Sequence, residues 1–335
     1  MRSRVIFGCS GPVLEAAERD FFRDAQPWGF ILFGRNVQSP EQVRELVDGL
    51  RDTIGDARAP VLIDQEGGRV ARLKPPAWNI RPPAARFGLL HAKAQQTATE
   101  AAYLNARLIA ADLAALGINV DCTPVLDLAV AGAHDIIGDR AFAADPVVVI
   151  ELGRAVMEGL MEGGVLPVMK HLPGHGRAAT DSHLELPHVT TAAADLSASD
   201  FVTFRSLNTC PMGMTAHVVY DAIDPNRPAT TSPRVIRDVI RGEIAFDGLL
   251  MTDDLSMDAL SGPISARAKA ALFAGCDVVL HCNGRMAEMQ EVAGEAKPLE
   301  GVSLKRAEQA LSHLVTPAAF DPAGAEARLF ELLAA

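Results

Sequence analysis

Short apolar runs recur along the chain, and longer stretches with helically spaced apolar residues separate them. Runs of this length are typical of strands buried on both faces, and their alternation with amphipathic helices is typical of βα repeats. The sequence predicts eight strands, at Val5–Ser10, Gly29–Asn36, Val61–Glu66, Ile118–Asp127, Leu166–His171, Gly213–Val218, Leu249–Asp254 and Asp277–Cys282.

Helical spacing fills most of the intervals, and no low-complexity linker interrupts it. Eight strands with intervening helices predict a single (β/α)8 barrel, a TIM barrel, over residues 1–335, with a helical C-terminal tail from about residue 303. An open, doubly wound sheet is the alternative architecture. The expected helices are Glu41–Ile54, Thr97–Leu116, Val147–Glu162, Ser232–Ile244 and Ser265–Ala274, and the tail from Leu304 to Leu333 is expected to be mostly helical.

Polar residues gather at the carboxyl ends of the predicted strands, whereas the amino-terminal halves are apolar. In a (β/α)8 barrel these ends ring one mouth, where active sites lie. Polar residues also mark ordinary transitions from strand to loop, so this ring alone does not establish a site. Its members are Asn36, Asp64, Asp127, Lys170, His171, His217, Asp253, Asp254, His281 and Asn283.

Composition narrows the classes of partner and the cellular compartment. The chain has 335 residues and a formal net charge of −11, which argues against nucleic acid or an anionic membrane as partner. Its five cysteines are odd in number and scattered, so we expect buried thiols in a reducing compartment. No signal peptide or membrane-spanning run can be read, so a cytoplasmic location is expected. A closed barrel leaves no sheet edge to cover, so we expect a monomer.

The first candidate motif is the segment Asp64–Arg72, DQEGGRVAR, directly after an apolar run. Its glycine pair permits a tight turn with backbone close to a ligand. A carboxylate that accepts from sugar hydroxyls and arginines that donate through a planar fork can hold a polyhydroxylated substrate. An internal ion pair of Asp64 with Arg69 or Arg72 is the structural alternative.

The second candidate motif is KHLPGHG at residues 170–176, followed by Asp181 and His183. Proline and glycine make the loop after Lys170 and His171 non-helical. In an extended segment, residues two apart place their side chains on one face. An aspartate beside a histidine fixes the imidazole tautomer and raises its basicity. A lone loop histidine is ordinarily solvated and idle, but the density of histidine, lysine and aspartate here favours catalysis.

Two shorter motifs add a carboxylate pair and an arginine. Asp253 and Asp254 end a strand, where adjacent side chains point to opposite sides. One carboxylate could face the mouth and attack an anomeric carbon, and the other could pair in the wall or cap the next helix. Arg140 lies in the loop sequence GDRAF, where an ordinary surface arginine is the alternative.

Together these motifs resemble the bacterial β-N-acetylhexosaminidases of glycoside hydrolase family 3, the single-domain enzymes of peptidoglycan recycling. The similarity runs from about Gly29 to Gly284 and includes IDQEGGRVARL, IGDRAF, KHLPGHG with TDSH, MTAHVVYDAIDPNRPAT and MTDDLSM. The resemblance implies a (β/α)8 barrel and a retaining, two-step mechanism without a metal or an organic cofactor. It also implies a role in cell-wall biogenesis, cell shape and cell division.

Residue by residue, the resemblance implies that Asp253 is the nucleophile and His183 the acid/base, with Asp181 as its partner. The substrate it implies is a small muropeptide: terminal, non-reducing β-linked N-acetylglucosamine in GlcNAc-1,6-anhydroMurNAc and its peptides. Because small residues surround His183, we expect its loop to move during turnover. The sugar-binding residues that the resemblance implies are Asp64, Arg72, Arg140, Lys170 and His171.

Three other functions stay open at this point. A metal-dependent barrel hydrolase could use His171, His175, His183 and Asp253 as ligands. A non-catalytic sugar-binding protein would keep Asp64 and Arg72 without needing the other groups together. A β-glucosidase or phosphorylase specificity would use the same scaffold, since an imidazole acid/base would not repel phosphate.

Overall fold

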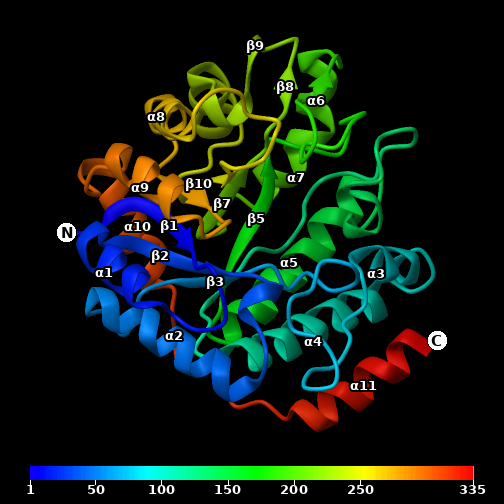
Figure 1. The fold of residues 1–335 in the computed structure, drawn as a ribbon. Coiled ribbons are helices and arrows are strands. Elements are labelled where there is room, and N and C mark those ends of the chain that lie inside the picture. The colour runs from blue at the N-terminus through cyan, green and yellow to red at the C-terminus, as the bar shows by residue number, and fades with distance from the viewer. Residues whose placement is uncertain (335) are drawn as a thin grey trace.

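The computed structural model describes residues 1–334, and its centre is a closed barrel of eight parallel strands in the order β1-β11-β10-β7-β5-β4-β3-β2. Helices surround the barrel (Figure 1). The first strand pairs with both the second and the last, so the predicted (β/α)8 barrel is confirmed and the open sheet is wrong. The barrel strands are β1 (Ser3–Gly8), β2 (Pro27–Leu32), β3 (Val61–Ile63), β4 (Val120–Asp121), β5 (Leu166–Leu172), β7 (Met212–Thr215), β10 (Leu249–Asp254) and β11 (Val278–His281).

The helices begin and end at local signals in the sequence. In α2, for example, the Ser39 side chain accepts a hydrogen bond from the Gln42 amide, and Gly55 ends the helix with a φ of 64°. The α-helices are α1 (Ala16–Ala25), α2 (Pro40–Ile54), α3 (Ala84–His91), α4 (Gln95–Ala114), α5 (Pro146–Glu162), α6 (Ala193–Ala198), α7 (Asp200–Ser206), α8 (Ile264–Ala274), α9 (Met286–Glu295), α10 (Gly301–Ser312) and α11 (Pro322–Ala334). The 3₁₀ turns are η1 (Gly34–Asn36), η2 (Gly138–Arg140) and η3 (Ala229–Thr231).

Two of the sequence expectations need correction. The strand expected at Ile118–Asp127 is regular only over β4, because Pro124 has no amide hydrogen to continue the ladder, although Val125 still bridges to Lys170. The helix expected at Ser232–Ile244 is a π-helix, η4, over Val235–Glu243. The sequence also did not predict α1, α3, α6, α7 and α9, nor a small outer sheet of β6 (His188–Val189), β8 (Val219–Tyr220) and β9 (Asp224–Pro228).

Alternating strand residues divide the core into an inner and an outer layer. Ile6 belongs to the cluster inside the barrel, whereas its neighbours Val5 and Phe7 pack in the cluster that includes the surrounding helices. This follows from the two-residue period of a strand, and it explains why the strands are apolar on both faces.

Helix α10 closes the amino-terminal end of the barrel. Its Ala307 and Ala310 belong to the inner cluster, together with strand residues such as Val278. The buried Asp277 carboxylate fastens this end, because it accepts hydrogen bonds from Ser303 Oγ at 2.7 Å and from Arg241 at 2.7 Å. With this end filled, the carboxyl-terminal mouth is the end of the barrel at which a substrate can approach the strand ends.

The remaining C-terminal chain lies outside the barrel. Helix α11 packs along α4 (Figure 1). The buried Arg81 joins them, with ion pairs to Asp112 at 3.0 Å and to Glu326 at 2.7 Å. All five cysteines are buried and unpaired. Within residues 1–334, no helix has both the length and the apolarity needed to cross a bilayer.

Candidate active site

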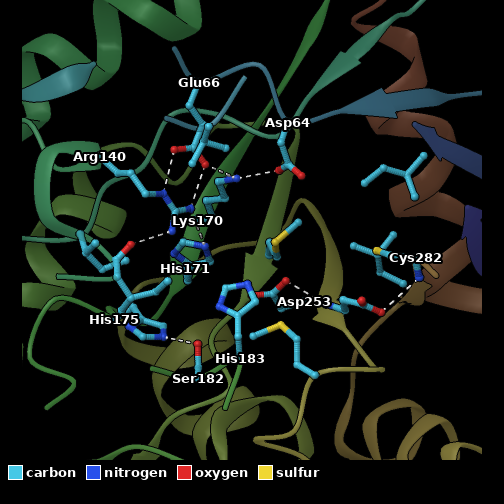
Figure 2. Close-up of a pocket in the computed structure, with 18 of the residues that line it drawn as sticks. Asp64, Glu66, Arg140, Lys170, His171, His175, Ser182, His183, Asp253 and Cys282 are labelled. Atoms are coloured by element: carbon cyan, nitrogen blue, oxygen red, sulfur yellow. Dashed lines mark hydrogen bonds and ion pairs between the residues drawn. The ribbon is translucent and has the colours of Figure 1, made fainter. Parts of the chain in front are cut away.

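A cavity of about 400 Å³ opens at the carboxyl-terminal mouth of the barrel (Figure 2). Its walls come from the carboxyl ends of the barrel strands and from the loops that follow them. The residues that line it include Phe33, Asp64, Glu66, Arg69, Arg72, Ile136, Arg140, Lys170, His171, His175, Ser182, His183, Met214, Asp253, Asp254, Met257 and Cys282.

One side of the cavity is a network of alternating carboxylates and cations. Lys170 Nζ lies 2.9 Å from Asp64 Oδ1 and 2.6 Å from Glu66 Oε1. Glu66 also binds Arg140 through both carboxylate oxygens, at 2.8 and 2.9 Å. Asp64 takes a second partner in Arg72, at 3.0 Å. The ion pair considered as the structural alternative is therefore present, with Arg72 as the partner of Asp64, whereas Arg69 pairs with Asp135 and Asp139.

The network holds its members in their charged forms. Burial alone would raise the pKa values of Asp64 and Glu66, but Lys170 and the arginines outweigh burial and lower both. Burial would lower the pKa of Lys170, but the carboxylates of Asp64 and Glu66 outweigh burial and raise it. Charged donors and acceptors fixed in this way suit sugar hydroxyls, because they need no reorganisation when a ligand enters.

Asp121 lies beneath this network and behaves differently. Its Oδ1 accepts the Gln65 amide at 2.9 Å, and its buried Oδ2 has no partner among the described residues. Burial is the largest influence and raises the pKa of Asp121 to about 8, so this carboxyl group is protonated at neutral pH.

The raised pKa of Asp121 predicts a pH-dependent stability difference. Asp121 has a higher pKa folded than unfolded, so its contribution to stability falls as the pH rises from about 4 to about 8. Asparagine does not titrate. We therefore expect Asp121→Asn to gain stability relative to the wild type across that range, by up to about 1.4 kcal/mol for each pH unit. Urea unfolding of both proteins at about pH 4.5 and 7.5 measures this. A difference that is the same at both pH values would contradict it.

A second carboxylate organises the adjacent histidines. Asp127, fully buried, lies 2.7 Å from His171 Nδ1 and accepts the His175 amide at 2.6 Å. Burial would raise the pKa of Asp127, but its contacts with His171 and His175 outweigh burial and lower it. The His171 ring is thereby fixed with Nε2 toward Arg140, at 3.5 Å.

The two carboxylates at the end of β10 have different partners. Asp254 accepts hydrogen bonds on both oxygens, from the Ser256 amide and hydroxyl and from the Cys282 amide. Asp253 accepts one hydrogen bond, on Oδ1 from the Asp254 amide at 2.8 Å, and within residues 1–334 its Oδ2 takes none. Asp254 thus ties β10 to β11 through a turn, and the expected helix cap is wrong, because the next helix begins only at Ile264.

The free oxygen of Asp253 belongs to an ionised carboxylate. Burial would raise its pKa, but the imidazoles of His217 and His171 outweigh burial and lower the pKa below its ordinary value. His217 is held in place by Thr230 Oγ1 at 2.7 Å and by the Asp254 carbonyl at 3.0 Å. A cavity-facing carboxylate that is ionised at neutral pH can act as a nucleophile.

Asp181 and His183 lie on a short segment, residues 180–185, which we call the dyad loop. His183 Nδ1 is 2.9 Å from Asp181 Oδ1, and the same oxygen accepts the His183 amide at 2.8 Å. The segment is a turn rather than the extended segment considered from sequence, and this turn brings the two side chains together. With its proton on Nδ1, His183 keeps Nε2 available, and its ring lines the cavity beside Asp253 (Figure 2).

The structure gathers the predicted site residues in one place. Seven of them line the cavity, and the eighth, Asp181, contacts it through His183. Sequence reasoning assigned no role in this site to Glu66, Asp127, Ser182 or His217. Their places in the sequence could have identified them, because Asp127 and His217 lie at predicted strand ends and Glu66 and Ser182 lie inside the recognised motifs. The residues that line the cavity as predicted are Asp64, Arg72, Arg140, Lys170, His171, His183 and Asp253.

The alternative metal site is not assembled. Within residues 1–334, no group of three or more histidine, cysteine, aspartate or glutamate side chains could hold a metal ion. Of the postulated ligands, His171 and His183 bond to aspartates through Nδ1, and His175 bonds to Ser182 through Nε2.

Comparison with known proteins defines the class. The sequence profile of the glycosyl hydrolase family 3 N-terminal domain matches residues 13–316, and the chain belongs to this family. Among curated relatives, a β-hexosaminidase of Alkalilimnicola ehrlichii is 42% identical over 83% of this chain and 80% of its own. A β-hexosaminidase of Tolumonas auensis is 39% identical over 92% and 88%. The protein is accordingly a glycosidase of the β-hexosaminidase type.

Solved structures agree with this placement. NagZ from Neisseria gonorrhoeae, in complex with N-trifluoroacetyl-D-glucosamine, superposes with a TM-score of 0.87 at 31% identity, covering 99% of this chain and 97% of that one. A family 3 β-N-acetylglucosaminidase from Paenibacillus gives a TM-score of 0.82 at 28% identity, covering 99% of this chain and 62% of its own.

Proposed function

We propose that this protein is a retaining β-N-acetylglucosaminidase of cytoplasmic cell-wall recycling. Its substrate would be a small muropeptide that carries terminal, non-reducing β-linked N-acetylglucosamine, such as GlcNAc-1,6-anhydroMurNAc or its peptides. The observation that carries the proposal is one cavity that holds both an uncommitted carboxylate oxygen on Asp253 and the His183 imidazole backed by Asp181. The solved relative that binds an N-acylated glucosamine analogue supports the choice of sugar.

Asp253 and His183 can together carry out both steps of a retaining reaction. In the first step, protonated His183 donates its proton to the leaving glycosidic oxygen while Asp253 attacks the anomeric carbon, which forms a glycosyl ester and breaks the glycosidic bond. In the second step, neutral His183 takes a proton from water, and the resulting hydroxide displaces Asp253. An imidazole titrates near neutral pH, so it can change roles without a large pKa shift.

The sugar would sit against the network of carboxylates and cations. Asp64 can accept from hydroxyl groups, and Arg72, Arg140, Lys170 and His171 can donate. Because these groups are already paired with one another, the substrate would enter a set of fixed charges rather than order loose side chains. The barrel closes its own sheet, so the protein would act as a monomer.

The test is to incubate the protein with GlcNAc-1,6-anhydroMurNAc and follow the anomeric protons by NMR. The proposal expects β-N-acetylglucosamine as the first product, with the α anomer appearing only by mutarotation. Initial release of the α anomer would overturn it. Running the same assay with the matching β-glucoside and with added phosphate distinguishes glucosidase and phosphorylase specificities, which would give faster glucoside cleavage or a sugar 1-phosphate.

Chelation tests the competing metal mechanism. We expect activity on a chromogenic N-acetylglucosaminide to be unchanged in excess EDTA, because within residues 1–334 no three of the side chains that a metal would require converge on one point. Loss of activity that returns on adding zinc would favour the metal-dependent reaction.

A further inference from the structure

The hydrogen bonds between Asp181 and His183 do not fix where the dyad loop lies. Both bonds join residues of the same turn, so a loop that moved away from the barrel would carry the pair with it intact. His183 is itself loosely held, since 57% of its side chain is exposed. Another contact has to place the imidazole over the cavity.

Ser182, between the two dyad residues, makes that contact. Its Oγ lies 2.9 Å from His175 Nε2, in a bond between side chains that are 2% and 3% exposed. In the described structure, this is the only hydrogen bond or ion pair that joins residues 180–185 to any residue outside that segment. The turn thus directs Ser182 down to the barrel and His183 across its mouth.

His175 is a rigid base for such a contact. Its amide is held by Asp127 at 2.6 Å, and its ring lies edge-on to that of His171, with centroids 5.6 Å apart. The next residue, Gly176, packs so closely on the chain that a Cβ atom would lie 2.1 Å from the Leu128 carbonyl oxygen. Asp127 therefore anchors both a histidine of the sugar site and the histidine that holds the loop.

The His175 ring is neutral under working conditions. Burial, reinforced by His171, lowers its pKa to about 4. A neutral imidazole shares one hydrogen bond with a hydroxyl group, and breaking that bond exposes no buried charge.

We propose that His175 and Ser182 form a latch that holds the dyad loop closed and so positions His183 over Asp253. Both are positioning residues, because they act through His183. The inference rests on the proposed role of His183 as the acid/base.

The test compares Ser182→Ala with the wild type on a 2,4-dinitrophenyl N-acetylglucosaminide. This leaving group departs without acid assistance, so the burst of dinitrophenolate needs Asp253 but not a closed loop, whereas breakdown of the glycosyl-enzyme needs His183 as base. We expect an unchanged burst rate constant and a steady-state rate about tenfold lower, the effect of losing one buried hydrogen bond. Amide hydrogen exchange over residues 178–186 should become faster.

Matched variants separate the latch from general destabilisation. Ser303→Ala also removes one buried serine hydroxyl, bonded to Asp277 at the opposite end of the barrel, and should leave turnover and exchange of the dyad loop unchanged. His175→Gln can place an amide near the position of Nε2 and should retain more activity than His175→Ala. If the buried His175→Ala does not fold, Ser182→Ala decides the question.

The latch is overturned if Ser182→Ala keeps wild-type turnover, if the burst and the steady state fall equally, or if loop exchange does not change. It is also overturned if the losses in the double variant Ser182→Ala/His175→Ala add rather than coincide. His183→Ala separates failure of the acid/base assignment from failure of the latch. If His183→Ala keeps normal activity, His183 is not the acid/base. If His183→Ala loses activity while Ser182→Ala keeps it, His183 remains the acid/base and only the latch is overturned.

Discussion

Replacing Asp253 by alanine should abolish turnover, with kcat lowered by about four to six orders of magnitude, the range seen when a nucleophile is removed. Asp253 is the carboxylate at the mouth with an oxygen that no described residue engages, and its lowered pKa keeps it ionised at neutral pH. Without it, no covalent intermediate can form. Steady-state kinetics on an aryl N-acetylglucosaminide, with mass spectrometry of the enzyme, measures both consequences.

The neighbouring Asp254→Ala is the matched control. Its carboxylate accepts three hydrogen bonds that join the end of β10 to Ser256 and Cys282. We expect this variant to lose about 1–3 kcal/mol of stability, because it leaves buried donors unpaired, and to retain most of its kcat. An inactive Asp254→Ala beside an active Asp253→Ala would reverse the assignment.

Replacing His183 by alanine should lower kcat on substrates with poor leaving groups by about 10²–10⁴-fold, the contribution of general acid–base catalysis. Both steps use this imidazole, so both should slow. With a 2,4-dinitrophenyl glycoside, the first step recovers while the second stays slow. The glycosyl-enzyme should then accumulate and be detected as a mass increase on the intact protein.

External nucleophiles provide the control for His183→Ala. Azide needs no general base, so it should speed the breakdown of the intermediate and yield a glycosyl azide with retained configuration. Asp181→Asn should show a weaker form of the same behaviour, because it leaves His183 present but without its anionic partner. Near-normal activity of His183→Ala on ordinary substrates would mean that another group is the acid/base.

The local sequence pattern was sufficient to locate the strands, because a strand buried on both faces is a short continuous run of apolar residues. Each of the eight predicted strands overlaps a barrel strand, but β2, β3 and β7 end three or four residues before the predicted end, and β4 is cut short at a proline. The same pattern missed short helices such as α6 and α7, which have too few residues to display a helical period.

The candidate site could be predicted as a set of residues but not as a set of contacts. Glu66 was unassigned because its importance lies in joining Arg140 and Lys170, which come from different strands and loops. The turn that pairs Asp181 with His183 was expected as an extended segment. Sequence spacing alone permits both conformations, and the hydrogen bond of the His183 amide favours the turn.

The sequence by itself determined the repeating βα architecture, the ring of polar residues at the strand ends and the residue types available for chemistry. Only the tertiary structure decided which carboxylate keeps a free oxygen, which charges neutralise one another and which buried contact holds the dyad loop. The physical reason is the distance along the chain over which each kind of interaction acts. Periodicity and turn residues act between near neighbours in the chain, whereas ion pairs such as Lys170 with Asp64 and hydrogen bonds such as His171 with Asp127 exist only after the barrel has closed.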